Sequence, residues 1–298
     1  MASHVSAEIA SQPDSWRRVG ELIGPDLALP IPGQRVAVVG CGTSWFMAMA
    51  YASLREDAGQ GWTDAFAASE FPAGRPYDVI VAISRSGTTT EVTDLLADRV
   101  GAARSVAIVG VAGTPIAEAA DRRIVLDFAD EQSVVQTRFA TTTLALLRAH
   151  LGHDLTRLID HAERALSEPV PEAAVTAEQV TFLGHRWTVG VAHEAALKLR
   201  EAAQSWTESY PAYDYRHGPI AISAPGRLVW GFGNMPDGLR ADVQGTGATF
   251  LDSDLDPLAH LITAQRVAVA RAEALGLDPD RPRSLTRSVI LEPADPGA

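Results

Sequence analysis

The chain has 298 residues, of which 46% are hydrophobic and 21% are charged; this balance supplies a large core and excludes a disordered protein. Its formal net charge of −12, with no local run of Lys or Arg, argues against nucleic acid as a partner. Cys41 is the only cysteine, which excludes an internal disulfide, and no Cys/His cluster has metal-site spacing, so we expect neither a metal nor another cofactor. Polar residues at the start and the lack of a long apolar run predict a cytoplasmic protein without a membrane span.

Short β-branched segments alternate with helical patterns in the first half of the chain. The expected buried strands cover residues 35–39, 78–84, 105–110 and 123–128, and the expected helices cover residues 44–55 and 89–100. Because parallel strands need crossover helices, this rhythm predicts a parallel sheet covered by helices, with ligands at the carboxyl ends of its strands.

The second half repeats this rhythm after a proline-rich junction. Residues 133–166 look helical with a break at Gly152, and they lead into Glu168-Pro169-Val170-Pro171. Strands are then expected at residues 179–184 and 228–232, and helices at residues 190–203 and 258–275. We therefore expect an α/β chain of two subdomains, residues 1–168 and 169–298, each a three-layer α/β/α sandwich with a parallel sheet.

Two loops that follow expected strands carry hydroxyl groups. Gly40-Cys41-Gly42-Thr43-Ser44 is by itself typical of a glycine turn with a serine helix cap. The segment Ser84-Arg85-Ser86-Gly87-Thr88-Thr89-Thr90-Glu91 has five hydroxyls directly before a helix, which is more than capping needs. Several neutral donors at the positive end of a helix dipole suit a phosphate monoester. We therefore predict an anion site at this hydroxyl loop, residues 84–91.

These two loops together resemble the sugar isomerase (SIS) domain family, and most closely the isomerase half of glucosamine-6-phosphate synthase. Three later segments, residues 193–201, 215–221 and 282–289, resemble that half in the same order, so the likeness runs from about residue 8 to residue 292. It implies SIS-type sandwiches and a sugar phosphate held by Thr43, Ser44, Ser84, Ser86 and Thr89.

Two further positions of the resemblance carry different residues here. Arg85 stands where the synthase has glutamine; it could add a charge to the phosphate, or it could be a solvated loop arginine. Gln136, at the start of a helix expected over residues 132–148, matches a sugar-contacting position where the synthase has serine.

Glu194, Lys198 and Glu201 are spaced to share one face of the expected helix, either as an exposed ion pair or as an acid–base group. The resemblance implies that Glu201 is the base that moves a proton between sugar carbons C1 and C2, and that the other two line the same site. It also implies that His217 helps to open the sugar ring and reaches the site from a partner subunit. A homodimer with shared active sites is therefore expected.

The chain departs from the synthase in three ways. It lacks the cysteine nucleophile of the glutaminase domain, so we expect no glutamine-dependent amination. Arg287, which would line the substrate site, replaces a lysine, and arginine cannot form a Schiff base. The strand over residues 228–232 leads into Gly233-Asn234 rather than a second hydroxyl loop, which predicts one phosphate site per chain.

The resulting prediction is an enzyme that abstracts a proton next to the carbonyl of an amino-sugar 6-phosphate, either glucosamine 6-phosphate or N-acetylglucosamine 6-phosphate. An isomerase or deaminase is favoured because the carboxylate–lysine face and His217 are intact. One alternative is a lyase or dehydratase that eliminates the C3 substituent. Another is a non-catalytic sugar-phosphate sensor, which the short stretch before residue 30 disfavours because it leaves little room for a DNA-binding module.

Overall fold

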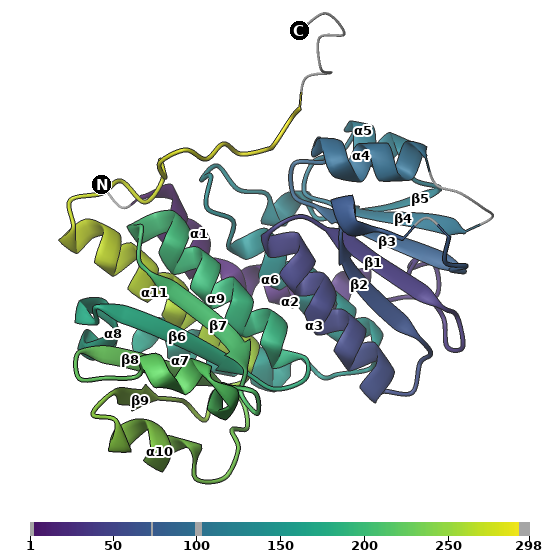
Figure 1. The fold of residues 1–298 in the computed structure, drawn as a ribbon. Coiled ribbons are helices and arrows are strands. Elements are labelled where there is room, and N and C mark those ends of the chain that lie inside the picture. Colours follow the sequence, from purple (N-terminus) through teal and green to yellow (C-terminus); the bar gives the residue numbers. More distant parts are fainter. Residues whose placement is uncertain (1–2, 73, 99–102, 292–298) are drawn as a thin grey trace, which may run out of the picture.

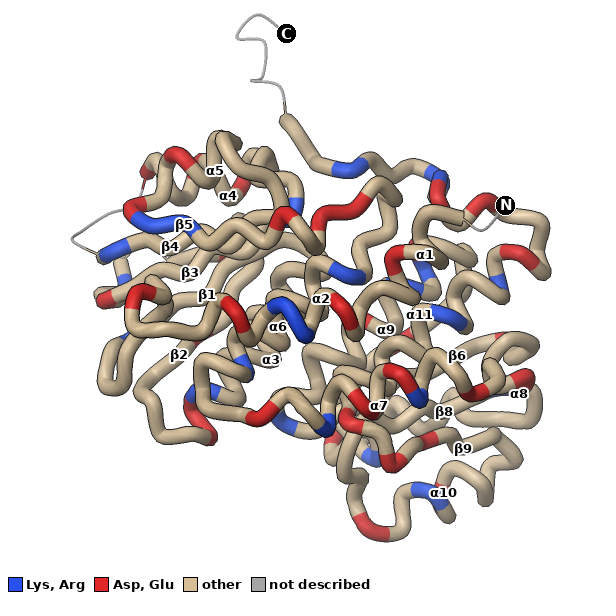
Figure 2. The backbone as a smooth tube through the Cα atoms, turned by 180° about the vertical axis from the view of Figure 1, so that it is seen from behind, with Lys and Arg blue, Asp and Glu red and all other residues tan. Residues whose placement is uncertain are grey.

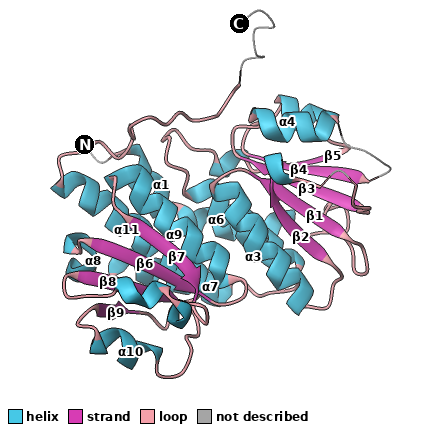
Figure 3. Cartoon of the chain, viewed as in Figure 1, coloured by secondary structure: helices cyan, strands magenta, loops and turns pink. Residues whose placement is uncertain are grey.

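The computed structural model describes residues 3–72, 74–98 and 103–291. Two sheets lie at opposite ends of the molecule, and several helices lie between them (Figures 1 and 3). Figure 2 shows basic and acidic positions interspersed along the backbone in that view. None of the helices in the described ranges combines the length and the apolar character needed to cross a bilayer.

The first sheet has the strand order β2-β1-β3-β4-β5, and all its pairs are parallel. Its strands are β1 (Val36–Gly40), β2 (Thr63–Ala67), β3 (Val79–Ser84), β4 (Arg104–Val109) and β5 (Arg122–Val125). The helices of this half are α1 (His4–Ala10), α2 (Gln12–Val19), α3 (Thr43–Asp57), α4 (Thr90–Ala97), α5 (Pro115–Ala119), α6 (Arg138–His150) and α7 (Thr156–Ser167). Short 3₁₀ helices cover Gly20–Leu22, Ala68–Glu70 and Asp127–Ala129.

The second sheet has the order β7-β6-β8-β9 and is also parallel throughout. Its strands are β6 (Gln179–Gly184), β7 (Thr207–Pro211), β8 (Arg227–Phe232) and β9 (Thr249–Leu251). The helices of this half are α8 (Glu172–Thr176), α9 (Thr188–Ala203), α10 (Leu239–Gly245) and α11 (Pro257–Ala274), with 3₁₀ helices over Tyr215–His217 and Pro219–Ile222. In both sheets the first strand of the half lies between the second and the third, so the expected architectural repeat is confirmed.

Alternating strand residues build three layers around each sheet. In β1, Val36 and Val38 belong to the large central hydrophobic cluster, whereas Ala37 and Val39 belong to a cluster that includes residues of α4 and α5. In the second sheet, Phe182 faces the central cluster and Leu183 packs with residues of α10. The prediction of two α/β/α sandwiches with parallel sheets is therefore confirmed.

The central cluster contains residues of both halves, so the two sandwiches share one core. The subdomain boundary at residue 168 stays a prediction; α7 ends at Ser167, next to the proline-rich junction.

Helices α3 and α9 lie side by side between the sheets (Figure 1). They pack closely at Gly190, where an added Cβ would lie 2.3 Å from the carbonyl oxygen of Phe46 and 3.0 Å from the amide nitrogen of Ala50. Glycine is required there because any side chain would push the two helices apart.

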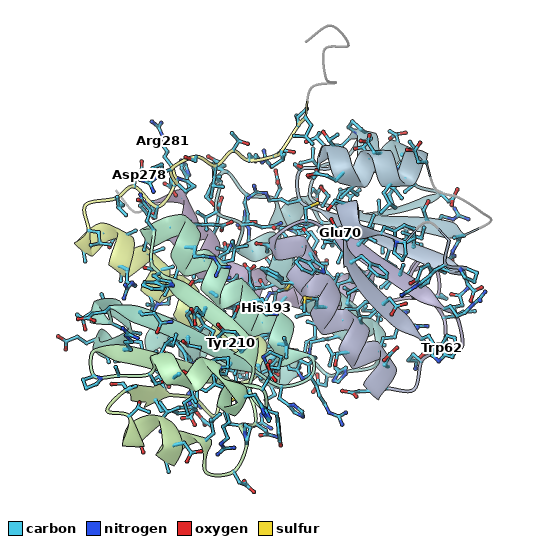
Figure 4. All side chains as sticks on the ribbon, in the orientation of Figure 1. Trp62, Glu70, His193, Tyr210, Asp278 and Arg281 are labelled. Carbon is cyan, nitrogen blue, oxygen red and sulfur yellow. The ribbon has the colours of Figure 1, made fainter. Side chains whose placement is uncertain are left out.

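The segment after α11 crosses back to the first half (Figure 1). Near its start, where Asp278 and Arg281 are labelled in Figure 4, Asp280 accepts hydrogen bonds from the amides of His4 and Val5 at 2.7 and 2.8 Å. At its far end, the carbonyl of Val289 accepts a hydrogen bond from the amide of Thr90, the first residue of α4, at 3.2 Å. Val289 therefore lies beside the hydroxyl loop.

The helix expected over residues 132–148 is wrong at its start, because α6 begins at Arg138. The carboxylate of Glu131 accepts hydrogen bonds from the amides of Thr137 and Arg138, both at 2.7 Å, and from the amide of Phe139 at 3.2 Å. Glu131 thereby accepts the hydrogen bonds of the first amides of α6, which have no partner within the helix. Gln136 precedes these residues and therefore lies in the loop before α6. The helix expected over residues 89–100 ends at Ala97 in the structure, and residues 99–102 lie outside the described part.

Candidate functional site

A pocket of about 200 Å³ opens at the carboxyl ends of β1 and β3. The strand that follows β1 in the chain, β2, lies on one side of β1, and β3 lies on its other side. The strand order therefore reverses at β1, and open α/β sheets bind ligands at such a point. Nine of the predicted site residues line the pocket, namely Thr43, Ser44, Ser84, Arg85, Ser86, Thr89, Gln136, Glu201 and Arg287.

The hydroxyl loop after β3 is folded around its own side chains. Ser84 Oγ accepts a hydrogen bond from the amide of Gly87 at 3.2 Å and lies 3.4 Å from Thr89 Oγ1. Ser86 Oγ accepts a hydrogen bond from the amide of Thr88 at 3.2 Å. Thr89, the residue before α4, makes no side-chain capping hydrogen bond. The hydroxyls are therefore not used to cap the helix, which favours the interpretation of this loop as an anion site.

The acid–base group lies behind the pocket on α9. Lys198 Nζ is 2.5 Å from Glu201 Oε2 and 3.3 Å from Glu194 Oε1. It also donates hydrogen bonds to Thr43 Oγ1 at 3.1 Å and to the carbonyl of Gln136 at 2.9 Å. The side chains of Lys198 and Glu194 are buried, whereas that of Glu201 is 18% exposed and lines the pocket. Among the three, Glu201 is thus the one placed to touch a ligand.

Burial and the neighbouring charges shift the pKa values of this group. Burial raises the pKa of Glu194 to about 7, although Lys198 opposes the shift. Burial lowers the pKa of Lys198, but the carboxylates of Glu194 and Glu201 outweigh it, so that the net pKa is raised. Lys198 therefore stays cationic at neutral pH and offsets the charge of Glu201.

Arg85 is buried, which rules out the solvated loop arginine. Its guanidinium donates hydrogen bonds to the carbonyls of Ser133, Val134 and Arg287 at 2.9, 3.2 and 3.0 Å, and it lies 3.8 Å from Glu131 Oε2. Burial lowers its pKa, while Glu131 raises it. Arg85 thus ties the hydroxyl loop to the loop before α6 and to the C-terminal segment, and its contact with a phosphate stays a prediction.

The remaining predicted residues differ in their placement. The side-chain nitrogen of Gln136 is buried without a hydrogen-bond partner among the described residues, and its residue lines the pocket. Arg287 forms an ion pair with Asp130 at the pocket. His217 lies on the 3₁₀ helix Tyr215–His217, is exposed, and does not line the pocket of its own chain. Its contribution to a neighbouring subunit stays a prediction.

Sequence reasoning missed residues that hold the site together from far along the chain. Ser288 Oγ accepts hydrogen bonds from Ser86 Oγ at 3.0 Å and from Thr88 Oγ1 at 2.9 Å. Glu8 accepts hydrogen bonds from the amide and hydroxyl of Ser133. Ser288 falls within the resembling segment at residues 282–289, but Glu8 and Glu131 carry no local signal because their partners become neighbours only in the fold.

The part of the chain that the structure covers contains no group of three His, Cys, Asp or Glu residues arranged to hold a metal ion. The pocket offers hydroxyls, the Glu201 carboxylate, the guanidiniums of Arg85 and Arg287 and the amide of Gln136, with the buried Lys198 ammonium behind it.

The SIS domain family model matches residues 32–151, which contain β1 to α6. The glutamine–fructose-6-phosphate aminotransferase (isomerizing) of Gloeobacter violaceus is 26% identical over 96% of this chain and 58% of its own length. The enzyme of the same name from Methanothermobacter thermautotrophicus is 29% identical over 87% of this chain and 52% of its own length. The chain thus spans about half the length of these curated relatives.

Solved structures match the whole fold. Glucosamine-6-phosphate deaminase from Thermotoga maritima superposes with a TM-score of 0.80 at 25% identity and covers 97% of this chain and 100% of its own. The C-terminal domain of glucosamine-fructose-6-phosphate aminotransferase from Francisella tularensis has a TM-score of 0.82 at 21% identity, with coverage of 95% and 99%. Tagatose-6-phosphate ketose/aldose isomerase from Escherichia coli has a TM-score of 0.76 at 18% identity, with coverage of 98% and 97%, and shares the fold. The chain therefore contains a SIS domain over residues 32–151, and its whole fold resembles those of these three proteins.

Proposed function

We propose that the chain is an enzyme that acts on an amino-sugar 6-phosphate, glucosamine 6-phosphate or N-acetylglucosamine 6-phosphate, as an isomerase or deaminase that uses no glutamine. One observation carries the proposal: the carboxylate of Glu201 and the hydroxyl loop line the same small pocket, with the Lys198 ammonium 2.5 Å behind that carboxylate. The likeness to the Thermotoga maritima deaminase, which covers both chains almost fully, supports it.

The hydroxyl loop would bind the phosphate and leave the other end of the sugar to Glu201. In open-chain glucosamine 6-phosphate the amine is on C2, next to the C1 aldehyde. Glu201 takes the proton from C2, the electron pair forms the C1–C2 double bond, and the C1 oxygen is protonated. Return of a proton to C1 gives a ketimine at C2, and water then replaces the nitrogen to release ammonia and fructose 6-phosphate.

Lys198 and Arg287 have electrostatic roles in this proposal. Lys198 pairs with the carboxylate of Glu201 and offsets charge that develops on the substrate oxygens. Arg287 is permanently protonated and cannot form a Schiff base with the sugar, so no covalent amine intermediate is needed or available at that position.

Separate incubations with glucosamine 6-phosphate and N-acetylglucosamine 6-phosphate test the proposal. Fructose 6-phosphate and ammonia should form from the first substrate, and no ultraviolet-absorbing enone should form from either. An enone without ketose would point to the lyase or dehydratase instead. Binding without any turnover would point to a sugar-phosphate sensor.

We further propose that the enzyme is a cytoplasmic homodimer with shared active sites. The exposed position of His217, outside the pocket of its own chain, supports a contribution from the partner subunit.

A further inference from the structure

A second pocket, of about 560 Å³, lies at the carboxyl ends of the second sheet. The loops that follow β6, β8 and β9 line it, at residues 185–188, 233–234 and 253–256. Because the strand order around β6 repeats the order around β1, this second pocket occupies the position in its sheet that the hydroxyl-loop pocket occupies in the first.

The carboxylates of the second pocket are all paired with arginines. Asp57 lies 2.6 Å from Arg186, and Asp256 lies 2.7 Å from Arg148. Asp254 pairs with Arg164. Each negative charge is therefore offset by a neighbouring guanidinium, and solvent also screens the exposed Asp57 and Asp254, which weakens the repulsion of an anion.

Cationic and aromatic groups remain for a ligand. Arg157 lines the second pocket and has no carboxylate partner among the described residues, and its Nε lies 3.4 Å from His161 Nε2. Arg186 is exposed, and only its Nη1 donates to Asp57, so the other N–H groups of its guanidinium can bind an entering anion. Trp187 also lines the pocket, and the guanidinium of Arg148 lies over its ring, 5.2 Å from the ring centre. The lining thus combines two arginines with one aromatic residue.

We infer that the second pocket binds the phosphate monoester of a small polar metabolite, in addition to the ligand of the first pocket. The guanidinium groups of Arg157 and Arg186 bind the phosphate, because planar forks suit phosphate oxygens. Asn234 and Ser253 line the pocket with an amide and a hydroxyl for the rest of the molecule. The pocket volume of about 560 Å³ has room for the whole metabolite, whereas inorganic phosphate alone would leave most of the pocket unfilled. The sequence predicted only one phosphate site per chain, because this pocket has no hydroxyl loop.

The test counts binding sites on the full chain by calorimetry with glucitol 6-phosphate, which has no carbonyl and cannot react. Wild type should bind two molecules per chain. Ser86→Asp, which puts a carboxylate into the hydroxyl loop, should leave one site. In the Ser86→Asp background, Arg157→Gln should raise the Kd of that site on the order of 10-fold. Arg157 is exposed and forms no ion pair with any residue that the structure describes, so this change should not unfold the protein.

Arg240→Gln is the control. Arg240 lies on α10, in the same half of the chain as the second sheet, and pairs with Asp252, but it does not line the second pocket. It should leave the number of sites and both Kd values unchanged. The inference is wrong if wild type binds only one molecule and Ser86→Asp abolishes that binding. It is also wrong if a site remains in Ser86→Asp but Arg157→Gln does not raise its Kd. Inorganic phosphate should bind the remaining site more weakly than glucitol 6-phosphate, and unphosphorylated glucitol should not bind; equal binding of either would overturn the ligand class. The readout needs no turnover, so it is independent of the proposed reaction.

Discussion

Glu201 is the residue on which the proposed chemistry depends most directly. A carboxylate that removes a proton from carbon must reach the substrate. Glu201 is placed to do so, because its side chain is 18% exposed at the pocket, and Lys198 Nζ lies 2.5 Å from its carboxylate.

Glu201→Gln should lower kcat on the order of 10²- to 10⁴-fold, because the amide cannot accept the proton. The affinity for glucitol 6-phosphate should change little, because the hydroxyl loop is untouched. Steady-state kinetics and calorimetry measure the two effects. Glu172→Gln, at an exposed position on α8, is the control and should retain full activity. Unchanged turnover in Glu201→Gln would remove this residue from the mechanism.

Glu194 should make the stability of the protein depend on pH. Its pKa rises from 4.5 to about 7 on folding, so between these values the folded state binds more protons than the unfolded state. The free energy of unfolding therefore falls as pH rises through this window and levels off above it. Glu194→Gln should flatten this fall. Urea unfolding of both proteins at pH 5 and pH 8 measures it, and an equally steep fall in the variant would contradict the assignment.

Gly190 determines how closely α3 and α9 pack. Gly190→Ala would place its Cβ 2.3 Å from the backbone oxygen of Phe46, so the helices must separate. We expect the variant to lose about 1–3 kcal/mol of unfolding free energy, as overpacked cores do. Chemical denaturation measures the loss. Gly245→Ala, at the end of α10, meets nothing within 4 Å and should not destabilise the protein.

Central strands were predictable from the sequence, whereas the edge strands β2, β7 and β9 were not; the edge strand β5 was expected, over residues 123–128. β1, β3 and β6 are buried along their whole length and appear in the sequence as continuous runs dominated by apolar residues. At the sheet edges, β2 and β7 are only partly buried, and polar residues such as Asp64 and Glu208 interrupt them. Their strand character comes from pairing with β1 and β6, which no local pattern records.

The site was predictable where its residues are close in sequence. The hydroxyl loop was visible as a dense local pattern, and the group on α9 followed from helical spacing. Glu131 and Glu8 were not visible, because a carboxylate that satisfies loop amides looks like any surface acid until the fold is known. Gln136 was expected inside a helix for the same reason, since Glu131 starts that helix two residues later.

At the scale of the whole molecule, the proposed homodimer makes a prediction about mixed subunits. If His217 acts on the pocket of the partner, Glu201→Gln and His217→Ala subunits complement each other. Co-expression in equal amounts gives half mixed dimers, each with one intact site out of two, so activity should reach roughly a quarter of wild type. If both residues served the same chain, every site would lack one of them and the mixture would stay inactive. Differently tagged subunits and an assay of the purified mixture decide between these outcomes.

The close contact between α3 and α9 also connects the two pockets. Thr43 begins α3 at the first pocket and Asp57 ends it at the second, whereas Thr188 begins α9 at the second and Glu201 lies near its end at the first. The two helices therefore run in opposite directions over about 20 Å, each with one end at each pocket. A ligand that binds Arg186 beside Asp57 acts at the ends of the same two helices that carry Thr43 and Glu201. If a ligand in the second pocket changes the affinity of the first pocket by some factor, a ligand in the first pocket changes the affinity of the second pocket by the same factor. This follows because binding linkage is reciprocal.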